Sequence, residues 1–124
     1  MTGKTILYVE DNEANRKMVR LLLKSTSYML IEAHDGEAGV AAAIERRPDL
    51  ILMDIQLPKI SGLEAIRRIR SNASVAGIPI IAITSFALAG DDLKAREAGA
   101  TEYLAKPYSP RELLALIRKL APES

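Results

Sequence analysis

Residues 50–58 read Leu-Ile-Leu-Met-Asp-Ile-Gln-Leu-Pro, and the first four form an apolar run that ends at an aspartate. The run does not alternate between apolar and polar residues, as a strand with one solvated face would. A strand buried on both faces is typical of a parallel sheet that is covered by helices on each side. The segment therefore predicts a central strand of an α/β protein, with Asp54 at its carboxyl end.

Four other short runs rich in apolar and β-branched residues occur in the chain, and each of the five is followed by a stretch that favours a helix. The expected strands are 5–9, 29–33, 50–53, 78–83 and 102–105, and the expected helices follow Asn12, cover 37–46, 63–70 and 91–98, and begin at Pro110. Right-handed crossovers leave few topologies for such an alternation. We therefore expect an α/β fold of the flavodoxin-like, doubly wound (βα)5 type, with a five-stranded parallel sheet in the order 2-1-3-4-5.

The composition limits the classes of function. The chain has 124 residues, a formal net charge of +1 and no cysteine, and 48% of its residues are hydrophobic. The near-zero charge argues against non-specific nucleic-acid binding, and the lack of cysteine excludes disulfides and thiolate zinc sites. The apolar runs are shorter than the roughly 20 residues of a membrane span, and the N-terminus does not resemble a signal peptide. We expect one cytoplasmic domain over residues 1–124, without an output domain and without direct binding to nucleic acid or membrane.

Acidic residues follow two of the expected strands. Ligands of open α/β sheets bind beyond the carboxyl ends of the strands, where the strand order reverses, and Glu10, Asp11 and Asp54 fall at that place. Thr84 and Lys106 end the fourth and fifth strands at the same edge. Two carboxylates ~5 Å apart repel by roughly 3 kcal/mol at an effective dielectric of ~20, so such a cluster takes up protons or binds a cation. An oxygen-only donor set favours Mg²⁺, and Mg²⁺ beside a nucleophilic carboxylate is the machinery of phosphoryl transfer to aspartate.

Five short motifs carry a family resemblance, four of them at expected strand ends and one just before the expected helix 63–70. The chain resembles the receiver domain of two-component response regulators over nearly its whole length, through Val9-Glu10-Asp11-Asn12, Leu52-Met53-Asp54-Ile55-Gln56-Leu57-Pro58, Ser61-Gly62, Ile83-Thr84-Ser85 and Tyr103-Leu104-Ala105-Lys106-Pro107.

The resemblance implies a role for each matching residue. Asp54 is then the phosphoacceptor, and Mg²⁺ is bound by Asp11 and Asp54, with help from Glu10, often through water, and from the backbone carbonyl of Gln56. The family often has an aspartate at the position of Glu10, so the longer side chain leaves open how Glu10 coordinates the metal. Lys106 is then the catalytic cation, and Thr84 and Tyr103 are the two switch residues. A cis Lys106–Pro107 peptide also occurs in the family.

The expected function follows from these roles. The chain would be a single-domain response regulator, not an enzyme, that accepts a phosphoryl group from a histidine kinase or a histidine phosphotransfer protein. It would signal to a downstream effector protein through the face built by the fourth helix, the fifth strand and the fifth helix, as a monomer or as a weak homodimer through that face. A further hypothesis places Phe86 over the phosphoryl group, where it would slow hydrolysis.

Two other functions fit the fold. A small Mg²⁺-dependent phosphatase with an aspartyl nucleophile is one, but Gln56 stands where such an enzyme needs an acid for the leaving group. A nucleotide- or flavin-binding module is the other, but the turn after the first strand is acidic and not glycine-rich.

Two smaller questions concern the surface. Arg67, Arg68 and Arg70 are expected on a solvated helix face, and Tyr108 and Pro110 form either a docking edge or loop packing.

Overall fold

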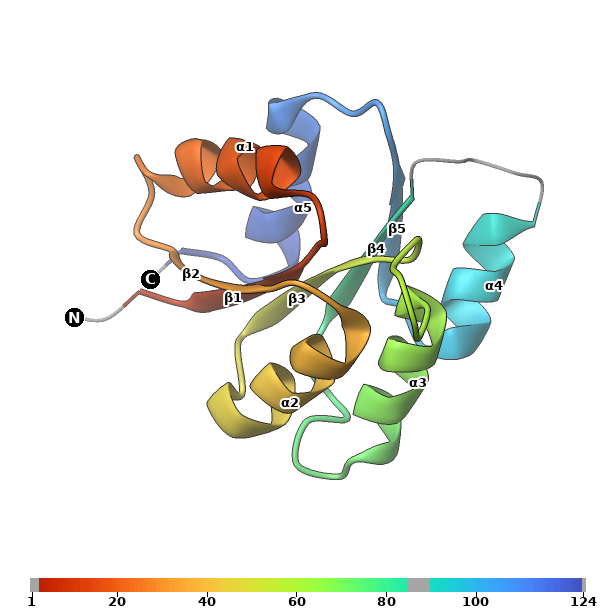
Figure 1. Cartoon of the computed structure of the whole chain (residues 1–124). Coiled ribbons are helices and arrows are strands. Elements are labelled where there is room, and N and C mark those ends of the chain that lie inside the picture. The colour runs from red at the N-terminus through yellow and green to blue at the C-terminus, as the bar shows by residue number, and fades with distance from the viewer. Residues whose placement is uncertain (1–2, 85–89, 124) are drawn as a thin grey trace.

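The computed structural model describes residues 3–84 and 90–123, in which strands and helices alternate along the chain (Figure 1). The elements are β1 (Thr5–Val9), α1 (Glu13–Leu23), β2 (Met29–Ala33), α2 (Gly36–Arg46), β3 (Leu50–Asp54), α3 (Gly62–Ser71), β4 (Ile80–Thr84), α4 (Asp91–Ala98), β5 (Glu102–Ala105) and α5 (Pro110–Leu120).

The sheet has five strands in the order β2-β1-β3-β4-β5, and all neighbouring strands are parallel. This confirms the expected topology. Three strand bounds differ from the expectation. β4 ends at Thr84 and not at residue 83, and it begins at Ile80 and not at residue 78, because Pro79 has no backbone N–H to give to a ladder. β3 extends to Asp54, which pairs in register with Ile83 of β4, so the phosphoacceptor candidate is itself the last residue of a strand.

The core has two layers, one on each face of the sheet. α2, α3 and α4 cover one face, and α1 and α5 cover the other (Figure 1). Successive strand residues point to opposite faces. In β3, Ile51 and Met53 pack with the first group of helices, whereas Leu50 and Leu52 pack with the second. The unbroken apolar run therefore supplies both layers, as the sequence predicts.

Side chains at the helix N-termini define where the helices begin. Asn12, Asp35, Ser61 and Ser109 are N-caps, and each accepts a hydrogen bond from the backbone N–H three residues further on. At α5 the cap is a full capping box, in which the Glu112 side chain accepts from the backbone N–H of Ser109. These caps place three of the helix starts next to the carboxyl ends of β1, β3 and β5.

Arg70 does not lie on a solvated face, so that expectation was wrong. Its guanidinium is partly buried and donates to the backbone carbonyl oxygens of Gly99 at 2.8 Å, Ala76 at 2.9 Å and Ile78 at 2.5 Å. These carbonyls lie at the end of α4 and before β4, where helix and strand ladders leave acceptors unused. Arg68 matches the expectation, because its exposed side chain pairs with Glu64 at 3.1 Å.

Gly62 allows α3 to start against the end of β3. A Cβ atom at this position would lie 2.1 Å from the backbone oxygen of Asp54 and 2.5 Å from Cα of Ile55. The backbone N–H of Gly62 instead donates to the carbonyl of Ile55 at 3.2 Å. Because Gly62 has no side chain, the start of α3 can pack directly against the backbone of Asp54 and Ile55 at the end of β3.

Among the described residues, no helix has the length and apolar character needed to cross a membrane.

Candidate functional site

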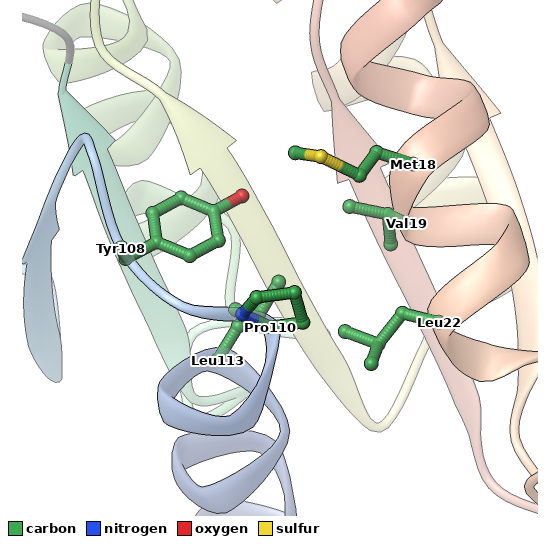
Figure 2. Close-up of a pocket in the computed structure, with 6 residues that line it drawn as sticks. All are labelled: Met18, Val19, Leu22, Tyr108, Pro110 and Leu113. Carbon is green, nitrogen blue, oxygen red and sulfur yellow. The ribbon is translucent and has the colours of Figure 1, made fainter.

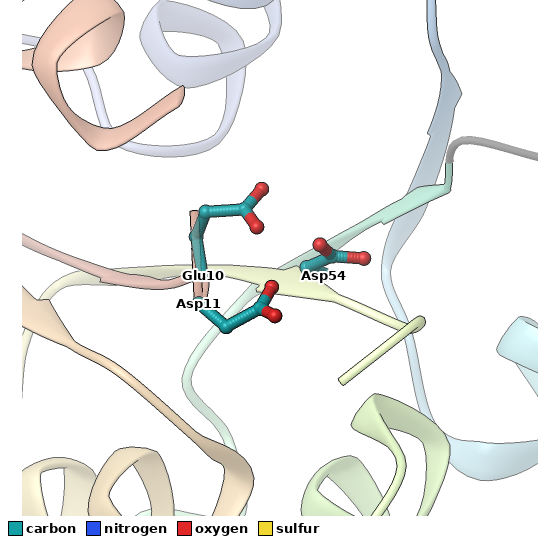
Figure 3. Close-up of side chains that lie close together, drawn as sticks. All are labelled: Glu10, Asp11 and Asp54. Carbon is teal, nitrogen blue, oxygen red and sulfur yellow. The ribbon is translucent and has the colours of Figure 1, made fainter. Parts of the chain in front are cut away.

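The acidic residues meet at the carboxyl ends of β1 and β3, where the strand order reverses. Glu10, Asp11 and Asp54 each offer a carboxylate oxygen, and these oxygens lie within 4.8 Å of one another (Figure 3). Glu10 and Asp54 are 1% and 3% exposed, whereas Asp11 is exposed to solvent. Two buried carboxyls and one accessible carboxylate therefore share one site at the expected edge of the sheet.

Glu10 is surrounded by hydrogen-bond donors. Its backbone N–H donates to the carbonyl of Ala33, and this bond anchors the residue to the end of β2. Its carboxylate accepts four hydrogen bonds, from the Tyr8 hydroxyl, the Asn15 amide, the Lys106 ammonium and the backbone N–H of Asn12, at 3.2, 3.2, 3.0 and 3.2 Å. The burial of Glu10 is thus compensated by donors from β1, α1 and the segment after β5.

The two buried carboxyls have pKa values that move in opposite directions. Burial raises the pKa of Asp54 to about 7, and the nearby Glu10 adds to this, although the backbone N–H of Gln56 donates to Oδ1 of Asp54 at 2.8 Å and opposes it. Burial also raises the pKa of Glu10, but hydrogen bonds with Asp54 and Lys106 outweigh it, so that this pKa lies below its ordinary value. At neutral pH the site therefore holds Glu10 as an anion and Asp54 near its midpoint.

Tyr8 and Asn15 were not among the candidates from the sequence. Tyr8 is fully buried in β1, and burial, followed by the proximity of Tyr108 and Glu10, raises the pKa of its hydroxyl above the usual tyrosine value. The hydroxyl is therefore a donor to Glu10 at neutral pH. The signal in the sequence was a single aromatic residue in a strand of otherwise aliphatic and β-branched residues, two residues before the acidic pair.

Thr84 and Gln56 lie together at the end of β4. The Gln56 side-chain amide donates to Oγ1 of Thr84 at 2.5 Å, and Thr84 is fully buried. The backbone N–H of Lys106 donates to the Thr84 carbonyl at 2.7 Å, so the two residues are tied at one edge. Thr84 also follows Ile83, which is the register partner of Asp54.

Tyr103 is half-buried in β5, opposite Ala82 of β4, and packs against the core layer formed with α2, α3 and α4. The Lys106–Pro107 peptide is cis, as the resemblance allowed. The hypothesis on Phe86 concerns a residue that lies outside the described part of the chain.

The donor set fits a hard divalent cation. The three carboxylates present only oxygen, and neither sulfur nor imidazole is part of the cluster. Oxygen ligands of this kind suit Mg²⁺, which retains several waters and uses one or two protein carboxylates. Asp11 is the accessible member, while Oε1 of Glu10 already accepts three hydrogen bonds and its Oε2 accepts one.

A small apolar pocket lies beside this site, on the other side of Tyr108. Figure 2 shows its lining side chains, which come from α1, from the segment before α5 and from the start of α5: Met18, Val19, Leu22, Tyr108, Pro110 and Leu113. Tyr108 and Pro110 thus lie opposite α1, and together with α1 they line this pocket.

The fold and the site together define a doubly wound α/β domain with an acidic centre at its topological switch point. Comparison with known proteins gives the family: residues 6–118 match the response regulator receiver domain, and the chain belongs to that family.

Relatives and solved structures agree with this assignment. The chain is 41% identical over 115 residues to the polar-differentiation response regulator DivK of Brucella anthropi, which covers 93% of this chain and 94% of that protein. The receiver domain of the sensor histidine kinase PA1611 from Pseudomonas aeruginosa PAO1, solved with a magnesium ion coordinated in its active site cleft, is 39% identical, with a TM-score of 0.87 over 95% of this chain and 97% of that one. The chemotaxis protein CheY4 of Vibrio cholerae is 28% identical, with a TM-score of 0.88 over 94% of this chain and 98% of that one.

Proposed function

We propose that this chain is a single-domain response regulator that accepts a phosphoryl group on Asp54 in a Mg²⁺-dependent reaction. The observation that carries the proposal is the convergence of Glu10, Asp11 and Asp54, whose carboxylate oxygens lie within 4.8 Å of one another although they come from two distant segments. Membership of the receiver family supports it, as does the magnesium ion in the cleft of the similar receiver domain.

In the proposed reaction, a carboxylate oxygen of Asp54 attacks the phosphorus atom of a phosphohistidine on a histidine kinase or phosphotransfer protein. An O–P bond forms and the P–N bond breaks, and its electron pair remains on the imidazole nitrogen, which takes up a proton. The hydrogen bond from the Gln56 N–H to Oδ1 holds the Asp54 carboxyl in one orientation. Because ATP-dependent kinases supply such donors, we place the exchange in the cytoplasm.

The residues that would hold Mg²⁺ are Asp11, Asp54 and the backbone carbonyl of Gln56, with Glu10 acting through water. Bound Mg²⁺ supplies positive charge beside the transferring group. The Lys106 ammonium, which pairs with Glu10 at 3.0 Å, supplies a second cation. The side chain of Lys106 is a flexible four-carbon stem, so its ammonium can turn from Glu10 to a phosphoryl oxygen.

We further propose that Thr84 and Tyr103 convert the new charge into a change of surface. A phosphoryl group on Asp54 offers acceptors to the O–H of Thr84, whose oxygen accepts from the Gln56 amide, and would draw the hydroxyl toward Asp54. Tyr103 would then move into the vacated space and alter the face formed by α4, β5 and α5. A shift of the population from about 1:99 to 99:1 needs about 5.5 kcal/mol, which several charge-assisted hydrogen bonds at roughly 1.5–3 kcal/mol each can supply.

The altered face would bind a downstream effector protein, or a second copy of the chain in a weak homodimer. In this proposal the protein acts as a signalling acceptor and not as an enzyme on free substrates. A phosphatase would need an acid near Asp54 for the leaving group, and the side chain two residues on is the Gln56 amide, which is bonded to Thr84.

The experiment is incubation with acetyl phosphate and MgCl₂, followed by intact mass spectrometry. The wild-type protein should gain about 80 Da, the mass of one dianionic phosphoryl group. Asp54→Asn should gain nothing, and Glu45→Gln, which changes an exposed carboxylate on α2, should behave as the wild type. A gain of mass in Asp54→Asn, or none in the wild type, contradicts the proposal.

A further inference from the structure

Arg16 is a buried arginine near the start of α1. It is 5% exposed, although its side chain is fully charged. Nη1 donates to the backbone carbonyl of Glu10 at 2.7 Å, Nη2 contacts Oε1 of Glu13 at 2.9 Å, and Nε lies 3.2 Å from Oε1 of Glu32. The guanidinium thus joins α1, the end of β1 and β2 through one planar group.

The contact with the Glu10 carbonyl bears on the neighbouring residue. A peptide group is planar, so a bond that holds the Glu10 carbonyl oxygen also sets the orientation of the amide that begins Asp11. The other side of Glu10 is fixed as well, because its backbone N–H donates to the carbonyl of Ala33 at 3.0 Å. The backbone that carries Asp11 is therefore held from β2 on one side and from Arg16 on the other.

The Asp11 side chain depends on this support. Asp11 is exposed, and among the described residues no donor holds its carboxylate. The carboxylate of Glu10, in contrast, is held by four donors. The backbone therefore sets the position and the Cα–Cβ direction from which Asp11 extends toward Asp54 (Figure 3).

We propose that Arg16 is a positioning residue for the cation site, which orients Asp11 through the Glu10 carbonyl. This inference rests on the proposed function, because it takes Asp11 to be a ligand of Mg²⁺. Outer-shell groups that orient a metal ligand commonly change metal affinity by about 10–100-fold when they are removed. For Arg16 we expect the lower end of this range, about tenfold, because the ligand is reached through the backbone.

Arg20 is a matched control for Arg16. It lies one helical turn further along α1 and contacts the same two carboxylates, Glu13 at 2.7 Å and Glu32 at 2.7 Å. In the described part of the chain it does not contact the Glu10 carbonyl. Arg16 and Arg20 therefore share their charge and both acidic partners. They differ in the bond to the Glu10 carbonyl and in burial, because the side chain of Arg16 is 7% exposed and that of Arg20 is 40% exposed.

The charge of Arg16 and its positioning role have effects of opposite sign on cation binding. Removal of a positive charge near the site lowers the repulsion of Mg²⁺ and by itself makes binding tighter. Loss of the Glu10 anchor makes binding weaker. The direction of the change in affinity thus separates the two effects.

The experiment is a titration with MgCl₂ followed by two-dimensional ¹H–¹⁵N NMR, which reports the fold of each variant and the dissociation constant in the same spectra. Arg16→Met should weaken Mg²⁺ binding about tenfold, whereas Arg20→Met should bind as the wild type or slightly tighter. Arg16→Lys keeps the buried charge but loses the planar fork, and should bind several-fold more weakly than the wild type. If Arg16→Met gives no folded spectrum, Arg16→Lys decides.

Wild-type or tighter binding by the folded Arg16 variants overturns the inference. Asp11→Asn and Asp54→Asn separate this outcome from a failure of the proposed function. If these two substitutions leave Mg²⁺ affinity unchanged, the proposed metal site itself is wrong. If they weaken binding while Arg16 variants do not, the site stands and only the role of Arg16 is refuted.

Discussion

Asp54→Asn is expected to stabilise the folded protein at pH 8 in the absence of divalent cations. Asp54 is 3% exposed and shares its site with two other carboxylates, so its charged form is unfavourable in the folded state. Burial is the main cause that raises its pKa from 3.8 to about 7. Asparagine has nearly the same shape and carries no charge, so it removes this penalty.

The sign and the pH range follow from proton linkage. Between pH 4 and pH 7 the folded protein binds a proton at Asp54 that the unfolded chain has released. The stability of the wild type therefore falls as the pH rises through this range, and the full penalty is present above it. At about 1.4 kcal/mol for each tenfold change in the dissociation constant, the penalty is at most about 4 kcal/mol. Asp54 and Glu10 are linked by a hydrogen bond, so the penalty is divided between the two carboxyls. We therefore expect the variant to gain about half of the upper limit, or about 2 kcal/mol.

The assay is urea unfolding, followed by circular dichroism, at pH 5 and at pH 8. With a slope of about 1–3 kcal/mol/M, a gain of about 2 kcal/mol moves the midpoint upward by about 1 M at pH 8. The gap should be much smaller at pH 5, where Asp54 is protonated in the folded wild type. Glu45→Gln is the control for the loss of one exposed negative charge, and its midpoint should stay close to the wild type at both pH values.

Addition of MgCl₂ gives an independent check, because a cation that binds only the folded state stabilises it. At pH 8 the wild type should gain stability and approach Asp54→Asn, which should gain less. An equal or lower midpoint for Asp54→Asn than for the wild type at pH 8, or a gap that is the same at both pH values, would refute the reasoning.

Three other predictions follow from particular contacts. Gly62→Ala should lower the free energy of unfolding by about 2 kcal/mol or more in urea titrations, because the new Cβ would lie 2.1 Å from the Asp54 carbonyl oxygen. Gly77→Ala, where nothing lies within 4 Å, should be neutral or slightly stabilising, and equal effects at the two glycines would contradict the steric argument. Arg70→Met should lower the thermal midpoint, with a loss of about 1–3 kcal/mol from the unpaired carbonyls, whereas the exposed Arg67→Met should change it little; a neutral Arg70 variant would count against the contacts. The affinity for Mg²⁺ in calorimetric titrations should fall as the pH is lowered from 8 to 5, because the raised pKa of Asp54, caused mainly by burial, lets protons compete with the cation, and a pH-independent affinity would show that Asp54 is not a ligand.

Much of the fold could be predicted because periodicity reports burial directly. The unbroken run 50–53 predicted a strand with two covered faces, and β3 supplies both core layers. The end of β3 and both ends of β4 differ from the expected bounds by one or two residues. Pairing across the sheet decides such limits: Asp54 continues the ladder opposite Ile83, and Pro79 cannot donate to it.

The acidic centre was also predictable, since parallel strands end at one edge of a sheet. Glu10, Asp11 and Asp54 therefore had to lie near one another once the strand order was known. The hydrogen bonds within the site were not predictable. Lys106 bonds to Glu10 across 96 positions of sequence, and that choice depends on side-chain conformations from separate segments.

The sequence by itself thus determined the layers, the order of the strands and the edge at which the carboxylates gather, because spacing along the chain encodes which face each residue presents. Only the tertiary structure decided how that edge is held. It places Tyr8 and Asn15 on the Glu10 carboxylate and Arg16 on its carbonyl, and it turns Arg70 inward toward three backbone oxygens. These polar groups find partners only when segments far apart in the sequence pack together. The residue pattern of one segment does not indicate which donors and acceptors the neighbouring segment offers.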